Sequence, residues 1–204
     1  MSNGPFTTPD YENPEYWDNR YSQSTEMYDW YHDWNQLYPY IKKVHTFSGE
    51  ERVLNLGCGN SVCSYQMVES VFKSVVNIDI SVVCIYQMQQ KYADDPRLTW
   101  ETMDCQHLDF DDNSFDVVFD KGTLDALICS NESIDIVITT FAEVERVLSP
   151  GGLFIEVSYA PPDHREKFFK DIGKNWIRHP PIPVPHPTEE GIFHHIYLFE
   201  LPKE

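Results

Sequence analysis

The feature that most constrains the fold is an apolar segment that ends in a glycine turn. It is followed, 22 residues after the first glycine, by a carboxylate at the end of a second apolar segment. The first segment reads Val53-Leu54-Asn55-Leu56-Gly57-Cys58-Gly59-Asn60-Ser61, and the second reads Val76-Asn77-Ile78-Asp79. Such apolar runs are typical of strands buried on both faces of a parallel sheet. The pattern predicts the strand, turn and helix unit of a doubly wound α/β fold.

The same pattern predicts a site for a cofactor that carries a nucleoside. A helix that follows a glycine turn directs its free N–H groups at the turn, and an acidic residue about 20 residues later accepts hydrogen bonds from ribose hydroxyls. The dinucleotide fingerprint needs a third glycine where this chain has Val62, which disfavours a dehydrogenase. Gly57-x-Gly59 followed by Asn60-Ser61 resembles instead motif I of the class I S-adenosylmethionine-dependent methyltransferases.

Strand-like runs alternate with amphipathic helical runs along the middle of the chain, which favours a mostly parallel sheet covered on both faces. The expected strands are Arg52–Leu56, Ser74–Ile78, Leu98–Thr102, Phe115–Phe119 and Leu153–Ser158. The expected helices are Ser61–Phe72, Ser81–Tyr92 with Ser81 as its N-cap, and Ile134–Leu148. Residues 51–204 are expected to form one methyltransferase domain.

Both ends of the chain depart from this alternation. Proline should keep Pro161-Pro162 and the run from Pro180 to Pro187 out of regular structure, and Ile192–Leu201 should complete an antiparallel edge hairpin. Residues 1–50 are dense in aromatic side chains and are expected to form one or two helices that fold over the cofactor as a lid. The alternative is that these aromatic side chains simply pack on the sheet.

Composition excludes several classes of function. The formal charge of −18, from 33 acidic and 15 basic residues, argues against nucleic acid, because phosphate binding needs clustered Lys and Arg. The same charge suits a basic protein substrate. No apolar run approaches the roughly 18 residues of a membrane span, and Met1-Ser2-Asn3-Gly4-Pro5 lacks the features of a signal peptide.

The cysteines and histidines indicate a reducing compartment and no metal. The five cysteines form no C-x-x-C pair, so we expect a cytoplasmic protein in which they are small buried apolar groups. His194 and His195 are adjacent, and on a strand they would point to opposite faces and could not bind one ion. A monomer is expected.

Four motifs occur together and in order, and they carry a family resemblance. They are Glu15-Tyr16-Trp17-Asp18-x-x-Tyr21, Tyr28-Asp29-Trp30, Leu56-Gly57-Cys58-Gly59-Asn60-Ser61 and Asp120-Lys121-Gly122-Thr123-Leu124-Asp125-Ala126-Leu127. From about Glu15 to Leu201 the chain resembles the elongation factor 1A lysine methyltransferases. The resemblance implies a seven-strand sheet, S-adenosylmethionine as the cofactor, and elongation factor 1A as the protein substrate.

The resemblance also implies roles for the residues around the methionine and ribose parts of the cofactor. Gly57 and Gly59 would let these parts pass close to the backbone. Asp79 would accept hydrogen bonds from the ribose hydroxyls. Lys121 would pair with the methionine carboxylate, or alternatively with Asp120 or Asp125.

The adenine would be held by the ends of the next two segments. Ile80 would pack beside the ring, Asp104 would accept from the adenine amino group, and the backbone N–H of Cys105 would donate to the ring.

The aromatic N-terminus would complete the cofactor site. Trp17, Tyr21 and Trp30 match positions that contact the cofactor in the family, and aromatic faces suit a sulfonium cation. Asp120, at the end of the fourth strand, is the candidate for orienting the acceptor amine. Two further functions stay open: a methyltransferase for a small molecule, and a noncatalytic cofactor-binding subunit of a partner enzyme.

Overall fold

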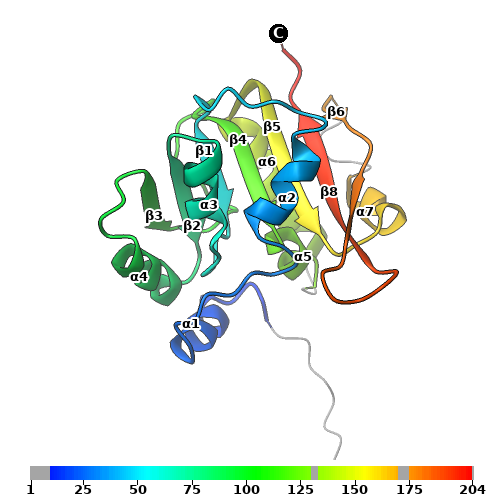
Figure 1. Cartoon of the computed structure of the whole chain (residues 1–204). Coiled ribbons are helices and arrows are strands. Elements are labelled where there is room, and N and C mark those ends of the chain that lie inside the picture. Colours follow the sequence, from blue (N-terminus) through cyan, green and yellow to red (C-terminus); the bar gives the residue numbers. More distant parts are fainter. Residues whose placement is uncertain (1–9, 130–132, 170–174, 204) are drawn as a thin grey trace, which may run out of the picture.

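An eight-stranded sheet runs through the protein, and β1 (Val53–Leu56) is completely buried within it. The computed structural model describes residues 10–129, 133–169 and 175–203 (Figure 1). The residues Met1–Pro5, for which no signal peptide is expected, lie outside these ranges. The other strands are β2 (Val75–Asp79), β3 (Leu98–Thr102), β4 (Phe115–Lys121), β5 (Leu148–Ser158), β6 (Ile177–Arg178), β7 (Ile182–Pro185) and β8 (Phe193–Glu200).

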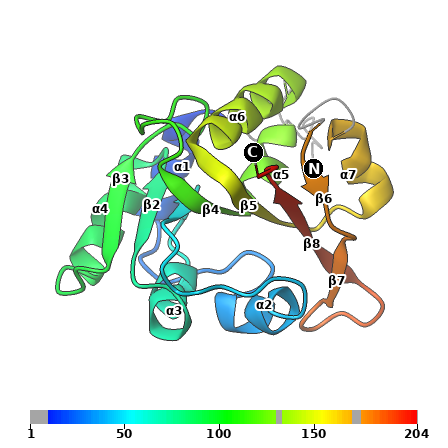
Figure 2. The same cartoon turned by 90° about the horizontal axis from the view of Figure 1, so that it is seen from above.

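Helices cover both faces of the sheet, as the alternating pattern predicts. They are α1 (Pro14–Ser22), α2 (Trp34–Ile41), α3 (Cys63–Ser70), α4 (Val82–Lys91), α5 (Thr123–Ile128), α6 (Ser133–Val147) and α7 (Pro162–Phe169). Viewed along the sheet in Figure 2, α2 and α3 lie on one side of the central strands, and α6 lies on the other. The Ser81 side chain accepts from the Cys84 N–H at 3.1 Å, which confirms the predicted cap of α4.

The strand order is β3-β2-β1-β4-β5-β8-β6. Strands β1 to β5 pair in parallel, and β8 pairs antiparallel with β5, so the expected doubly wound fold with an antiparallel C-terminal hairpin is confirmed. The resemblance implies seven strands, whereas the sheet has eight. The strand registers explain the difference. Strand β8 pairs with β5 along one edge, and the short strands β6 and β7 pair one after the other along its other edge, so together they occupy the place of one strand.

Two expectations about proline are wrong. Pro162 begins α7, where a proline is tolerated because the first helical N–H has no partner within the helix. The segment from Pro180 to Pro187 contains β7, in which Pro183 and Pro185 lie on the edge of the sheet and need no ladder partner on their outer side. The expectation that all five cysteines are buried is wrong for Cys129, which is exposed at the C-cap of α5, and Cys105 is half-buried.

The described part of the N-terminal segment has two different positions. Helix α1 lies beyond the carboxyl ends of the parallel strands (Figure 1), and it contacts α4. Helix α2 packs into the core, and the side chains of Trp34, Leu37 and Ile41 are all fully buried. Asp33 begins α2 with a capping box that includes Gln36. The segment is thus part cover and part core.

In the described part of the chain, the helices are all too short or too polar to cross a membrane.

Replacing Trp34 by alanine should destabilise the protein by about 3–5 kcal/mol, the usual cost of removing a buried aromatic side chain. The Trp34 ring packs against Tyr38, Phe72 and Phe119 and donates its N–H to Ser70 at 3.0 Å. Urea denaturation measures the change. The control is the exposed Tyr86 on α4: Tyr86→Ala should change the free energy of unfolding by no more than about 0.5 kcal/mol. A loss of less than about 1 kcal/mol in the free energy of unfolding for Trp34→Ala would mean that α2 is not part of the hydrophobic core.

Candidate active site

A cavity opens at the carboxyl ends of β1 to β4, where the strand order reverses between β1 and β4. In open α/β sheets this reversal creates a crevice in which ligands bind. The ten residues that the sequence suggests for the cofactor all line this one cavity: Trp17, Tyr21, Trp30, Gly57, Gly59, Asp79, Ile80, Asp104, Cys105 and Lys121. They come from the N-terminal segment and from the ends of four strands.

The glycine turn has no room for side chains. Gly57 and Gly59 have φ values of +58° and +54°, in the left-handed region that favours glycine. A Cβ at Gly57 would lie 2.0 Å from the Thr123 hydroxyl, and a Cβ at Gly59 would lie 3.0 Å from the Tyr21 hydroxyl. The backbone of the turn therefore faces the cavity directly.

Asp79 ends β2 with its carboxylate held by backbone donors. One oxygen accepts from the Gly59 N–H and the other from the Ser81 N–H, each at 2.9 Å. Burial raises the pKa of the carboxyl to about 6, because desolvation disfavours its charged form, and the two N–H donors oppose that shift. The side chain is thus oriented before any ligand arrives, which suits an acceptor for hydroxyl groups.

The proposed adenine side is built by the residues after β2 and β3. Ile80 and Asp104 line the cavity there, and the Asp104 carboxylate accepts from the Gln106 N–H at 2.9 Å. The Cys105 sulfur lies 3.8 Å from the hydroxyl of Thr140 on α6. The Cys105 side chain therefore contacts α6, and the contact of its backbone N–H with a ligand stays a prediction.

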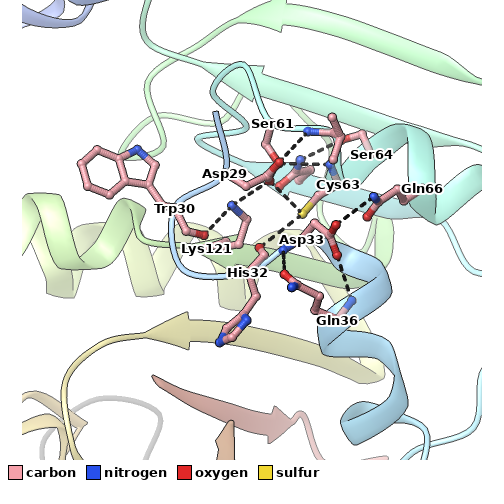
Figure 3. Close-up of polar contacts among 12 residues, drawn as sticks. Asp29, Trp30, His32, Asp33, Gln36, Ser61, Cys63, Ser64, Gln66 and Lys121 are labelled. Carbon is pink, nitrogen blue, oxygen red and sulfur yellow. Dashed lines mark hydrogen bonds and ion pairs between the residues drawn. The ribbon is translucent and has the colours of Figure 1, made fainter. Parts of the chain in front are cut away.

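Lys121 lies at the centre of a polar network that joins the N-terminal segment to the sheet (Figure 3). Its ammonium donates to Asp29 Oδ1 at 3.2 Å and to the Trp30 carbonyl at 2.9 Å. The Asp29 carboxylate also accepts from the Ser61 hydroxyl and from the Val62 N–H at 3.4 Å. Lys121 therefore pairs with Asp29. Since an ammonium has three donors, these two contacts leave one for a ligand.

The three predicted aromatic residues line the cavity from the N-terminal segment. Trp17 and Tyr21 on α1 stack with ring centroids 6.0 Å apart, and the Trp17 N–H donates to the Tyr11 carbonyl at 2.8 Å. Trp30 is 39% exposed, and the Arg20 guanidinium lies 5.1 Å from its ring centroid. Arg20 thus makes a cation–π contact with one face of the Trp30 ring.

Asp120 does not line the cavity, although it precedes Lys121 directly. Consecutive residues of a strand point to opposite faces, and the Asp120 carboxylate accepts from the N–H groups of Thr123 and Leu124 at 3.1 and 3.0 Å. It is completely buried, and burial raises its pKa to about 7. This geometry gives Asp120 a structural task at the start of α5 and provides no contact for the predicted orientation of an acceptor.

Sequence reasoning gave Asp29 no role, although it lies in a quoted motif. Its partner Lys121 is 92 residues away in the chain, and no local pattern links the two. The cavity is also lined by residues that lie outside the quoted motifs, namely Tyr11, Glu12, Met103 and Gln106.

Gly57→Ala should abolish ligand binding in the cavity and destabilise the fold, because the new methyl group would collide with Thr123. The matched control is Gly191→Ala, at a φ of +80° with no atom within 4 Å of the added Cβ. Gly191→Ala therefore measures only the cost of placing alanine at a positive φ, about 1–2 kcal/mol, without a steric collision. Thermal denaturation and ligand titration of both variants measure the difference. Equal effects of the two substitutions would contradict the close packing of the turn.

Three comparisons place this geometry among known proteins. Residues 54–155 match the family model described as "Methyltransferase domain". The chain is 36% identical to EEF1A lysine methyltransferase 4 of Mus musculus, with 92% of this chain and 75% of the relative covered. It is 35% identical to the protein of the same name from Bos taurus, with 95% and 77% covered.

A solved structure shares the fold. A SAM-dependent methyltransferase of Methanosarcina mazei superposes with a TM-score of 0.62 at 16% sequence identity, over 82% of this chain and 99% of the other. Together with the motifs in the sequence, these matches confirm the resemblance: the chain belongs to the S-adenosylmethionine-dependent methyltransferases and, among them, to the family of the EEF1A lysine methyltransferases.

Proposed function

We propose that this protein transfers a methyl group from S-adenosylmethionine to a lysine of translation elongation factor 1A. The observation that supports this most is the convergence of all ten predicted cofactor residues on one cavity at the switch point of the sheet. The names of the relatives support a lysine as the acceptor and elongation factor 1A as the protein that carries it.

The cavity has the chemical groups that the cofactor needs. The turn at Gly57 and Gly59 brings bare backbone to the ligand, and Asp79 is ready to accept from the two ribose hydroxyls. Lys121 has a remaining donor for the methionine carboxylate, and Ile80 and Asp104 suit the adenine ring and its amino group. The aromatic faces of Trp17, Tyr21 and Trp30 are compatible with a sulfonium cation.

The reaction mainly requires that the protein holds the two reacting groups in the right positions. The cofactor supplies a methyl group bound to a positively charged sulfur. A neutral lysine amine would take up this methyl group, with the C–N bond forming as the C–S bond breaks and the bonding electron pair staying on sulfur. The surplus proton leaves to water. The contribution of the protein is to hold the amine and the methyl carbon in line, which is the proximity term of catalysis.

The acidic surface supports a basic protein as the substrate. The net charge of −18 attracts a positively charged partner over several ångströms and disfavours phosphate-rich partners. An enzyme for elongation factor 1A would act in the cytoplasm, where translation takes place.

Binding of S-adenosylhomocysteine should weaken as the pH falls below about 6. Burial raises the pKa of Asp79 to about 6, so below that pH the free protein binds a proton that must leave before the ribose hydroxyls can donate to the carboxylate. The dissociation constant should rise by up to about tenfold per pH unit. Titration calorimetry between pH 5 and 8 measures this dependence. Asp79→Asn should bind weakly and independently of pH, and a flat wild-type profile would reject the role of Asp79.

The proposed function is tested by combining binding with transfer. Wild type should bind S-adenosylhomocysteine, Asp79→Ala should bind at least about tenfold more weakly, and the exposed control Asp94→Ala should match wild type. Labelled S-adenosylmethionine should then label a lysine of purified elongation factor 1A. Binding without any label on elongation factor 1A would reject this substrate. Labelling of a panel of metabolites instead would establish a small-molecule methyltransferase.

A further inference from the structure

Tyr31 has an unusual backbone conformation beside the cavity. Its φ is +65°, and Asn113 is the only other residue besides glycine with a positive φ in the described ranges. Asparagine tolerates this left-handed region, whereas for a bulky aromatic residue it is a genuine outlier that costs about 1–3 kcal/mol. Such a conformation persists only where the surroundings hold the residue, and strained residues cluster at functional sites.

Two neighbours fix the Tyr31 side chain against the wall of the cavity. Its hydroxyl donates to Asp125 Oδ2 at 2.7 Å. Its ring packs on Gly122, where an added Cβ would lie 3.3 Å from the ring carbon Cε2 and 3.7 Å from the hydroxyl oxygen. Gly122 itself lines the cavity. Tyr31 does not itself line the cavity, but its ring and hydroxyl pack on Gly122 at the end of β4, which does.

The hydrogen bond to Asp125 fixes the direction in which the Tyr31 O–H bond points. Asp125 is buried and also accepts from the Ser158 hydroxyl at 2.7 Å, from the Tyr159 N–H at 3.2 Å and from Arg165. An ionised carboxylate can only accept, so the proton of Tyr31 must point toward Asp125. Burial and this carboxylate raise the pKa of Tyr31 well above its usual range, and the hydroxyl stays protonated.

The oxygen of Tyr31 is consequently an acceptor and not a base. A phenol oxygen has lone pairs besides its O–H bond, and within the described residues the hydroxyl makes no other hydrogen bond than the one it donates to Asp125. A neutral primary amine carries N–H donors and needs its own lone pair free for attack. An acceptor that binds one N–H without taking the proton would hold such an amine in place.

We propose that Tyr31 positions the acceptor amine: its hydroxyl oxygen accepts an N–H of the attacking lysine, while Asp125 holds the hydroxyl in the required orientation. The amine then approaches along the Gly122 side of the cavity. The inference rests on the proposed function for the identity of the amine as a lysine, but its geometry applies to any primary amine acceptor.

The direct test uses a probe that carries the amine itself. The probe is an analogue of S-adenosylmethionine in which the methyl group is replaced by an alkyl arm with a terminal primary amine. Wild type should bind this probe more tightly than S-adenosylhomocysteine. Tyr31→Phe should bind S-adenosylhomocysteine as wild type does. The gain in affinity that the amine arm gives over S-adenosylhomocysteine should be about tenfold smaller in Tyr31→Phe than in wild type. Tyr86→Phe, which removes an exposed hydroxyl on α4, should keep the whole gain.

A second measurement separates positioning from a structural role. In single turnover on elongation factor 1A, Tyr31→Phe should transfer methyl groups about tenfold more slowly while it binds S-adenosylhomocysteine as wild type does. An unchanged gain from the amine arm would overturn the inference. So would a parallel loss of S-adenosylhomocysteine affinity and thermal stability, because the bond to Asp125 would then serve only to hold the N-terminal segment.

The outcomes for the two proposals are distinguishable. Wild type that binds the amine probe through Tyr31 but does not label elongation factor 1A rejects the proposed substrate and supports the inference. Wild type that labels elongation factor 1A while Tyr31→Phe keeps the full gain and rate supports the function and rejects the inference. Wild type that does not bind S-adenosylhomocysteine rejects both.

Discussion

The cavity depends on the buried ion pair between Lys121 and Asp29. The Lys121 side chain is only 6% exposed, and a buried ammonium is costly unless it is paired. Asp29 supplies the partner from the N-terminal segment, and the same carboxylate bonds the Ser61 hydroxyl and the Val62 N–H at the start of α3. One carboxylate therefore connects three parts of the chain: the N-terminal segment, the glycine turn and the end of β4.

This connection explains how an open sheet obtains an enclosed site. Parallel strands provide only the floor of the crevice, through Gly57, Asp79 and Lys121. The walls come from the N-terminal segment, which is fixed near one end by Asp18, bonded to the Ser81 hydroxyl at 2.5 Å, and near the other by Asp29. The acidic composition of the segment thus has a structural use, because its carboxylates bond donors at the edge of the sheet.

The central strands and the ten residues that meet at the cavity were predictable because their signals are local. The central strands are nearly continuous runs of apolar or β-branched residues, interrupted by single polar residues such as Asn55 in β1 and Asn77 in β2. The glycine turn and Asp79 occur at a characteristic spacing. Contacts between distant segments have no such signal: Asp29 and Lys121 are 92 residues apart, and Tyr31 and Asp125 are 94. The role of Asp120 was missed because α5 has only six residues and shows no helical periodicity. The edge prolines were misjudged because an edge position is decided by strand order.

A crystal structure of the protein with S-adenosylhomocysteine tests the central claim most directly. The account predicts the ribose hydroxyls on Asp79, the adenine between Ile80 and Asp104, and the ligand carboxylate on Lys121 while the ion pair with Asp29 is retained. A ligand bound outside this cavity would contradict the cofactor site. A bound ligand whose carboxylate replaces Asp29 on Lys121 would contradict the view that this ion pair holds the site together.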